Sequence, residues 1–344
     1  MSSQELIAVA EAMVQPGKGI LAADESTGTI ERRLASIDTP STEANRQAWR
    51  ELLFTAPGLG DTISGVILFD ETLRQQTSDG RRMVDVLTAA GVIPGIKIDL
   101  GAKDLAGHPG ETVTEGLDGL RERLAEYREL GAKFTKWRAV INIGDGRPSP
   151  TAIATNAHAL GRSAALSQEA GLVPIVEPEV LMDGDHPIDR CLEVTEHMLR
   201  ATFAQLALQG VELEAIVLKP NMVLSGADAS NRANSEEVAD ATIAAFLRTV
   251  PAAVPGIAFL SGGQSDEEAT ENLDAMNRST RRSPWELTFS YGRGLQATPL
   301  RVWGGNADRV GAAQEALLHR ARVTAAARRG EYTREMETEV ATLA

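Results

Sequence analysis

The amino-acid sequence predicts an α/β fold, a single (β/α)8 TIM barrel with an N-terminal helix and a helical C-terminal tail. Short apolar runs recur along the 344 residues, helix-start signals lie between them, and polar residues gather at the ends of the runs. From residue 19 to residue 286 the starts of the runs advance by about 38 residues per step, which is room for a strand, a helix and two loops. The eight runs are residues 19–24, 65–70, 93–99, 134–143, 172–180, 214–223, 257–261 and 286–293.

The apolar runs are expected to be strands that are buried on both faces. Several of them are nearly continuous in hydrophobicity and rich in Ile and Val, without the polar alternation of a half-exposed strand. Between them, helix starts are indicated by Ser149 before a proline, Ser235 before two glutamates and Ser265 before three acidic residues. Strands that alternate with helices in this way predict a parallel sheet, here closed into a barrel.

The chain is expected to form one domain. No Ser/Gly/Pro-rich linker divides residues 1–344, so we expect the barrel core at about 19–303 and a C-terminal helix and tail at about 304–344. The first 14 residues, MSSQELIAVAEAMV, carry two acids in an amphipathic pattern, which predicts a helix and not a signal peptide.

Composition excludes several classes of protein. Hydrophobic residues make up 43% of the chain, which is enough for a full core and argues against disorder. The net charge of −14 argues against a nucleic-acid surface and against binding to anionic lipid. No run approaches 18 apolar residues, so no membrane span is expected. The one cysteine, Cys191, allows no disulfide framework, fits a reducing cytoplasm and is expected to be a small buried side chain in a helix.

Polar and charged residues end nearly every predicted strand. In a (β/α)8 barrel the functional groups collect at the carboxyl ends of the strands, and residues two apart on a strand point the same way. These endings therefore predict a ring of polar groups around one mouth. The endings are Asp24-Glu25-Ser26, Asp70, Lys97 with Asp99, Lys136 with Arg138, Glu177 with Glu179, Lys219, Ser261-Gly262-Gly263 and Ser290-Tyr291-Gly292-Arg293.

The ring contains residues that are suited to catalysis by a lysine amine. Lys219 ends an apolar run and stands directly before a proline, so it is either a snorkelling surface residue or a working one. Apolar surroundings and a nearby cation disfavour the ammonium form of a lysine, and the neutral amine can form a Schiff base with a carbonyl substrate. Lys136, two strands away, could be that cation, and Arg138 suits a phosphate or carboxylate.

The carboxylates of the ring have two interpretations each. Glu177 and Glu179 could shuttle protons during carbinolamine formation and dehydration, or could form ion pairs with Lys136 or Arg138. Asp24 could be a capping or ion-pair residue, or the partner that orients the reactive lysine.

Glycines after the last two strands indicate an anion site. Ser261, Gly262 and Gly263 follow the seventh strand, and Gly292 and Arg293 follow the eighth. Loops at these two positions of a barrel often hold a phosphate through close backbone approach and helix N-termini. Each glycine pair alone could be an ordinary tight turn, but together with an arginine they favour phosphate binding.

Seven stretches of the chain, which follow one another between about residue 17 and about residue 303, resemble class I fructose-bisphosphate aldolase. They are GKGILAADESTGTI, GVILFDETL, FTKWRAV, PIVEPEVL, VLKPNMV, FLSGGQS and LTFSYGR. The resemblance implies that Lys219 is the Schiff-base lysine and that Glu177 is the principal acid/base catalyst. It also implies supporting roles for Glu179, Lys136, Arg138 and Asp24, with Lys97 lining the site.

The same resemblance implies two sets of substrate-binding residues. One substrate phosphate would be held by Ser261, Gly262, Gly263, Ser290, Gly292 and Arg293. The other end of the substrate would be handled by Ser26, Thr29 and Arg33. We therefore expect Arg33 to matter only when a 6-phosphate is present. Animal members of the family end in a tyrosine, whereas this chain ends in EVATLA and its last tyrosine is Tyr332.

The predicted activity is reversible cleavage of fructose 1,6-bisphosphate to dihydroxyacetone phosphate and glyceraldehyde 3-phosphate, in glycolysis and gluconeogenesis. The predicted partners are sugar phosphates, and the resemblance implies a cytoplasmic homotetramer. No cofactor is expected, and no metal, because the five histidines form no HxH or HExxH pattern. The alternatives are another Schiff-base aldolase, a transaldolase-like barrel that needs one phosphate site, or a non-catalytic scaffold.

Overall fold

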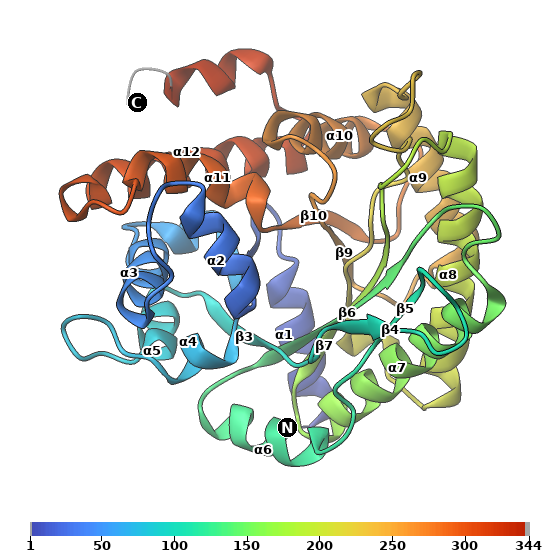
Figure 1. Cartoon of the computed structure of the whole chain (residues 1–344), viewed down its shortest axis with the longest axis horizontal. Helices are drawn as coiled ribbons and strands as arrows, with labels where there is room; N and C mark the ends of the chain where they lie inside the picture. The colour runs from blue at the N-terminus through green and yellow to red at the C-terminus, as the bar shows by residue number, and fades with distance from the viewer. Residues whose placement is uncertain (1, 341–344) are drawn as a thin grey trace.

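Eight parallel strands close into a barrel within residues 2–340, the part of the chain that the computed structural model describes (Figure 1). The strands follow one another around the barrel in the order β1, β2, β3, β6, β7, β8, β9 and β10, and β10 pairs with β1. Their bounds are β1 Gly19–Ala23, β2 Ile63–Leu68, β3 Ile93–Lys97, β6 Phe134–Ile141, β7 Val173–Val180, β8 Val217–Leu218, β9 Gly256–Phe259 and β10 Glu286–Tyr291.

The eight apolar runs of the sequence each hold one barrel strand, so the prediction of a (β/α)8 barrel is confirmed. The largest difference is β8, which is shorter than the predicted run at 214–223. A 3-10 turn, η2 at Leu213–Ala215, precedes this strand, and Pro220 follows it without an N–H to continue the ladder. The backbone N–H of Lys219 still bonds to the Val176 carbonyl at 2.8 Å, so the position of Lys219 remains tied to β7.

Helices surround the barrel, as Figure 1 shows. All three indicated helix starts carry a side-chain cap, because side-chain oxygens of Ser149, Asn234 and Ser265 accept backbone N–H bonds in the first turn, and two of these caps are the residues that the sequence indicates. At the second of these starts the cap is Asn234 and Ser235 is the first helical residue. The bounds are α1 Ser3–Met13, α2 Thr27–Ala35, α3 Glu43–Phe54, α4 Asp70–Arg74, α5 Met83–Ala89, α6 Leu120–Glu129, α7 Pro150–Glu169, α8 Ile188–Leu208, α9 Ser235–Thr249, α10 Asp266–Arg278, α11 Arg293–Trp303 and α12 Val310–Arg328. Short 3-10 turns lie at η1 Leu59–Asp61, η3 Ala307–Arg309 and η4 Arg334–Val340.

The predicted N-terminal helix is α1, and it packs across the amino-terminal end of the barrel. Its buried residues Leu6 and Met13 share a cluster with Ile20 and Phe134, which begin their strands. The buried Arg328 of α12 lies at the same end and donates to the backbone carbonyls of three residues near the start of β1. The amino-terminal end of the barrel is therefore closed by packing.

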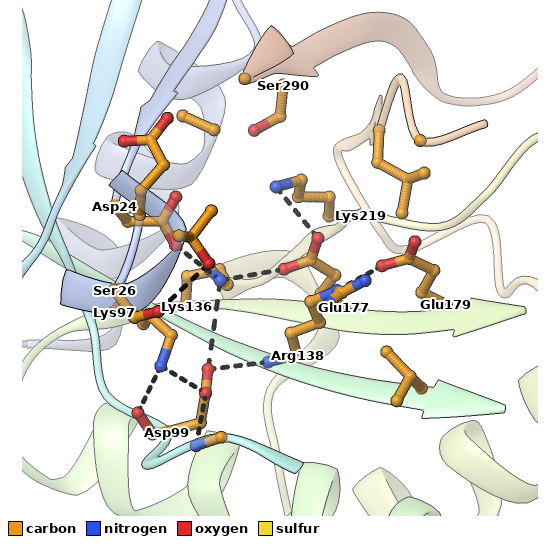
Figure 2. A pocket seen from close by; sticks show the side chains of 18 of the residues that line it. Asp24, Ser26, Lys97, Asp99, Lys136, Arg138, Glu177, Glu179, Lys219 and Ser290 are labelled. Atoms are coloured by element: carbon orange, nitrogen blue, oxygen red, sulfur yellow. Dashed lines mark hydrogen bonds and ion pairs between the residues drawn. The ribbon is translucent and has the colours of Figure 1, made fainter. Parts of the chain in front are cut away.

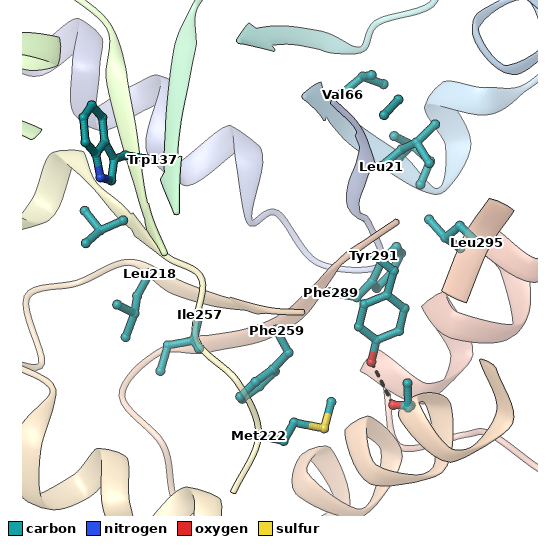
Figure 3. Packing of buried hydrophobic residues seen from close by; sticks show 14 of the residues in the cluster. Leu21, Val66, Trp137, Leu218, Met222, Ile257, Phe259, Phe289, Tyr291 and Leu295 are labelled. Atoms are coloured by element: carbon teal, nitrogen blue, oxygen red, sulfur yellow. Dashed lines mark hydrogen bonds between the residues drawn. The ribbon is translucent and has the colours of Figure 1, made fainter. Parts of the chain in front are cut away.

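The larger core cluster lies between the barrel wall and the helices. Figure 3 shows its side chains, among them Trp137, Phe259 and Tyr291 on three strands. The Tyr291 hydroxyl donates to the Ala269 carbonyl of α10 at 2.8 Å, so the one polar atom of this ring is satisfied. Cys191 on α8 is fully buried, which confirms its interpretation as a small core side chain.

A small hairpin was not predicted from the sequence. Its strands, β4 Ala102–Asp104 and β5 Thr112–Thr114, pair antiparallel to one another in a separate sheet, in the loop after β3. The residues of β4 are exposed, and a strand of three residues carries too few side chains for a hydrophobic period to be visible.

The predicted C-terminal helix and tail are confirmed as far as residue 340 by α12 and η4, and residues 341–344 lie outside the described part of the chain. Glu337 pairs with the buried Arg320 of α12 and accepts a bond from the Tyr332 hydroxyl at 3.1 Å. Within residues 2–340, no helix is both long enough and apolar enough to span a membrane.

Candidate active site

A cavity of about 500 Å³ lies at the carboxyl ends of the barrel strands, and its walls carry nearly all of the predicted site residues. The predicted residues that line it are Asp24, Ser26, Thr29, Arg33, Lys97, Lys136, Arg138, Glu177, Glu179, Lys219, Ser261, Gly262, Ser290, Gly292 and Arg293. Residues that are up to 269 positions apart in the sequence therefore meet in one space, as expected for the ends of parallel strands.

Lys219 reaches this cavity from the end of β8 and is 4% exposed. Its ammonium nitrogen lies 3.0 Å from Glu177 Oε1, on the adjacent strand β7 (Figure 2). The snorkelling interpretation is wrong, because the side chain is buried and points into the cavity.

Lys136 lies two strands away on β6, where the sequence placed the cationic neighbour. Its Nζ is 2.6 Å from Asp24 Oδ2, 3.3 Å from Glu177 Oε2 and 4.0 Å from Asp99 Oδ2. Burial opposes its charge, but these three carboxylates outweigh burial and raise the pKa of Lys136 above its ordinary value. Lys136 is therefore a fixed cation beside Lys219.

Asp24 is the ion-pair partner of Lys136, which is one of the interpretations the sequence left open. Burial alone would raise the pKa of Asp24, but the ammonium groups of Lys136, Lys219 and Lys97 hold that pKa well below its ordinary value. The carboxylate is therefore ionised at neutral pH.

The two glutamates of β7 have different surroundings. Glu179 pairs with Arg138 on β6, so the ion-pair interpretation holds for this residue. Glu177 lies between two lysines, with one carboxylate oxygen toward Lys219 and the other toward Lys136 (Figure 2). Of the two, Glu177 is the carboxylate in direct reach of the amine of Lys219.

Asp99 is a buried site residue for which the sequence analysis assigned no role. It lies 2.5 Å from the Lys97 ammonium, accepts the Gly101 N–H at 3.1 Å and accepts the Arg138 N–H at 3.3 Å. It therefore holds Lys97 at the cavity wall. Its position two residues after Lys97 at a strand end is the signal that could have identified it.

The loops after β9 and β10 present the groups expected of an anion site. Ser261 and Gly262 line the cavity after β9, and Gly292 caps the amino terminus of α11, which begins at Arg293. The hydroxyl of Ser290 is buried, points into the same space and has no hydrogen-bond partner. An unpartnered hydroxyl and a helix N-terminus that share one cavity suit an anionic ligand.

Gly263 is the predicted site residue that does not line the cavity. Its φ of 75° is in the left-handed region, and a Cβ atom there would lie 2.7 Å from Met182 Cε. Turn geometry and close packing explain the glycine at this position.

After β1, which pairs with β10, the Ser26 and Thr29 hydroxyls line the cavity and lie 3.2 Å apart at the start of α2. Arg33, on the same helix, pairs with Glu25, and its Nη2 lies 3.5 Å from the position of a Cβ on Gly292. The side chain of Arg33 therefore reaches the loop after β10.

Other cavity residues were given no role by the sequence analysis. Glu25 was named there only as part of a strand ending, and the remaining ones carry no charge. The hairpin and the turn before it contribute several, and other strand ends contribute the rest. They are Ala22, Glu25, Phe69, Leu100, Gly101, Ala102, Thr114, Val140 and Leu260. Among residues 2–340, no group of three or more His, Cys, Asp or Glu side chains is arranged to hold a metal ion.

Comparison with protein families gives one family across almost the whole chain. The family described as "Fructose-bisphosphate aldolase class-I" matches residues 5–343. The matched span includes every cavity residue described above.

Individual relatives agree with this family. The chain is 55% identical over 328 residues to "Fructose-bisphosphate aldolase 4, cytosolic" of Arabidopsis thaliana, covering 95% of this chain and 84% of the relative. It is 54% identical over 333 residues to "Probable fructose-bisphosphate aldolase class 1" of Xanthomonas axonopodis pv. citri (strain 306), covering 96% and 99%. A solved structure of fructose-bisphosphate aldolase from Plasmodium falciparum, in complex with TRAP and a small molecule inhibitor, superposes with a TM-score of 0.94 at 47% identity and covers 96% of this chain and 95% of its own.

Proposed function

The chain belongs to the class-I fructose-bisphosphate aldolase family, and from this premise we propose that it cleaves fructose 1,6-bisphosphate reversibly through a Schiff base on Lys219. The products would be dihydroxyacetone phosphate and glyceraldehyde 3-phosphate. The observation that carries the proposal is the 3.0 Å contact between the buried Lys219 ammonium and Glu177 Oε1, with Lys136 on the other oxygen of the same carboxylate.

The assignment of the nucleophile rests on the different partners of the two lysines. Three carboxylates surround the Lys136 ammonium and stabilise its charge, so this lysine is unsuited to attack as a neutral amine. Lys219 contacts Glu177, which can accept its proton directly. The charged Lys136 remains beside the reacting centre throughout.

The chemical steps follow from these positions. The Lys219 amine adds to the C2 carbonyl, and Glu177 delivers a proton to the departing hydroxyl, so that water leaves and an iminium forms. The iminium accepts the electron pair of the C3–C4 bond as this bond breaks. A carboxylate in the Glu177 and Asp24 neighbourhood takes the C4 hydroxyl proton, and glyceraldehyde 3-phosphate leaves. The remaining enamine is protonated at C3, and water then releases dihydroxyacetone phosphate and restores the lysine.

The substrate class is supported by two groups of residues that line the cavity. The loops after β9 and β10 offer Ser261, Ser290 and Arg293 to the phosphate on the dihydroxyacetone side. The Ser26 and Thr29 hydroxyls at the start of α2 suit the phosphate at the other end. This pair of anion sites fits a bisphosphate better than the single site of a transaldolase-like enzyme.

The location and assembly of the protein are proposed by analogy with its relatives. Relatives named cytosolic or cytoplasmic support a cytoplasmic enzyme of glycolysis and gluconeogenesis. By resemblance to the family we propose a homotetramer of this chain, formed from single-domain subunits.

Trapping of the Schiff base tests the proposal. Borohydride added with dihydroxyacetone phosphate should reduce the iminium and leave a covalent adduct on Lys219, located by peptide mass spectrometry. Lys219→Met should abolish both the adduct and turnover. Lys103→Met, on the exposed hairpin strand β4, is the matched control and should keep both. An adduct on Lys136 would reverse the roles of the two lysines, and no adduct with active wild-type protein would exclude the mechanism.

A further inference from the structure

Two arginines share one buried carboxylate at the edge of the cavity. Glu25 Oε1 pairs with Arg33 Nη1, and Glu25 Oε2 pairs with Arg50 Nη2. The side chains of Glu25 and Arg50 are 4% and 3% exposed, whereas that of Arg33 is 20% exposed. Glu25 and Arg33 line the cavity, and Arg50 approaches from α3 behind them.

The carboxylate of Glu25 is held in a fixed orientation. Gln296 Nε2 donates to Glu25 Oε1 at 2.9 Å and to the Ala22 carbonyl at 2.6 Å. The Trp49 indole donates to the other end of the Gln296 amide at 3.2 Å, and both of these side chains are buried. Glu25 is therefore fixed by Gln296 in addition to the two arginines.

The charges of this cluster do not balance. Burial alone would raise the pKa of Glu25, but Arg50 and Arg33 lower it, so the carboxylate is ionised. One negative charge then faces two guanidinium groups, which are always protonated. The neighbouring carboxylate of Asp24 is engaged by Lys136. The cluster thus keeps one uncompensated positive charge, and a buried excess charge calls for a counter-ion.

Only one of the two arginines can offer that charge to a ligand. Arg50 is enclosed and does not line the cavity. Arg33 lines it, and its Nη2 lies 3.5 Å from the position of a Cβ on Gly292, next to the loop of the anion site.

We propose that Arg50 is a positioning residue for substrate phosphate: it neutralises Glu25 from the interior, so that the charge of Arg33 stays available at the loop after β10. Without Arg50, the Glu25 carboxylate would hold Arg33 as its sole counter-ion and would compete with the phosphate for it. The inference rests on the proposed function. It also changes the expectation for Arg33, which should serve fructose 1,6-bisphosphate and fructose 1-phosphate alike.

A double-mutant cycle between Arg50 and Arg33 tests the proposal. Arg33→Ala should raise KM about tenfold for both substrates, as for the loss of a bond to a charged group. Arg50→Met should raise KM several-fold and leave kcat near the wild-type value, because Arg50 touches no reacting atom. In the Arg33→Ala background, Arg50→Met should have almost no further effect, because its influence passes through Arg33.

Two further variants separate positioning from a structural role. Glu25→Gln combined with Arg50→Met removes the competing carboxylate and should restore KM toward that of wild type. The matched control is Arg46→Met, one turn earlier on α3, where the arginine pairs with Glu71 away from the cavity; KM should not change.

The proposal is overturned if the Arg50→Met and Arg33→Ala effects on KM multiply, or if Glu25→Gln fails to restore KM in the Arg50→Met protein. If Arg50→Met does not fold, the double variant Glu25→Gln/Arg50→Met is compared with Glu25→Gln alone, because the double variant has no unpaired buried carboxylate. A large difference in KM between these two variants overturns the proposal.

Thermal stabilisation of the protein by inorganic phosphate gives a measurement that does not depend on turnover, and this stabilisation should be weaker in Arg50→Met. If the wild-type protein binds phosphate but does not cleave the bisphosphate, the proposed function is wrong. The inference about Arg50 and phosphate binding would still stand.

Discussion

Lys136 and Lys219 are both buried lysines at the barrel mouth, yet their neighbours give them different chemistry. Asp24, Glu177 and Asp99 surround the first, whereas an oxygen of Glu177 faces the second. Three carboxylates stabilise the charge of Lys136, whereas the amine of Lys219 has one carboxylate, which it shares with Lys136. The two lysines differ because of their partners at the ends of β1, β3 and β7. In the sequence, each of them is only a lysine at the end of an apolar run.

At the residue scale, Arg293 should bind the phosphate that every ketose substrate carries. Arg293→Ala should weaken fructose 1,6-bisphosphate and fructose 1-phosphate alike, by about 1.5 to 3 kcal/mol, since a hydrogen bond between charged groups is lost. Steady-state KM and kcat for the two substrates measure this. Arg301→Ala, on the exposed side of the same helix, is the control. An effect confined to the bisphosphate would place Arg293 at the other phosphate.

At the scale of elements, the two ends of the barrel have opposite compositions. The carboxyl ends of the strands open into the charged cavity, whereas the amino ends are packed against α1. Arg328 of α12 joins this closed end by donating to the carbonyls of Val14, Gln15 and Lys18 and by pairing with Glu286 at 2.9 Å. The residues that stabilise the fold at α1 and α12 and the residues that line the cavity therefore lie at opposite ends of the barrel.

This separation predicts a variant that loses stability without losing its site. Arg328→Met removes the donors to buried carbonyls and should lower the free energy of unfolding by about 2 to 4 kcal/mol. Urea unfolding measures the loss, and KM measured well below the unfolding temperature should not change. Arg322→Met, on the exposed face of α12, should leave both quantities unchanged. A raised KM for Arg328→Met would show that the two ends of the barrel are coupled.

At the scale of the whole molecule, a chain with a net charge of −14 has a cavity that presents arginines and lysines to its ligand. The two facts are compatible because a ligand in a cleft responds to the nearby charges, and the remote surface charges are screened by solvent and salt. The net charge argues against a nucleic-acid partner. It carried no information on a sugar phosphate.

The whole molecule should also act without a bound metal ion. EDTA should leave aldol cleavage unchanged, because the proposed electron sink is the iminium on Lys219 and needs no Lewis acid. Initial rates before and after dialysis against the chelator measure this, with borohydride trapping as the positive control. Full loss of activity that returns with added Zn²⁺ would point to a metal-dependent aldol mechanism.

The sequence by itself determined the barrel, because each of its strands is a short apolar run and each step is long enough for a helix and two loops. It also determined most of the residues that ring the mouth, because a charge at the end of a run points to the same end of a parallel barrel. Asp70 is the exception among the charged endings, since it begins α4, pairs with Arg74 and does not line the cavity. Its motifs identified the family. The division into one domain and the roles of the individual site residues remain predictions of this kind.

Only the tertiary structure decided which of those residues touch. Glu177 could have paired with either lysine or with an arginine; it lies opposite Arg138 in the register of β6 and β7, yet its carboxylate contacts the two lysines. Glu179, which lies opposite Val140, is the residue that pairs with Arg138. Arg33, a sequence neighbour of Ser26 and Thr29, pairs with Glu25 and reaches the position of Gly292. Residue type and strand position can be read locally, but the partner of a charge depends on contacts between segments far apart in the chain, and these exist only after the barrel has closed.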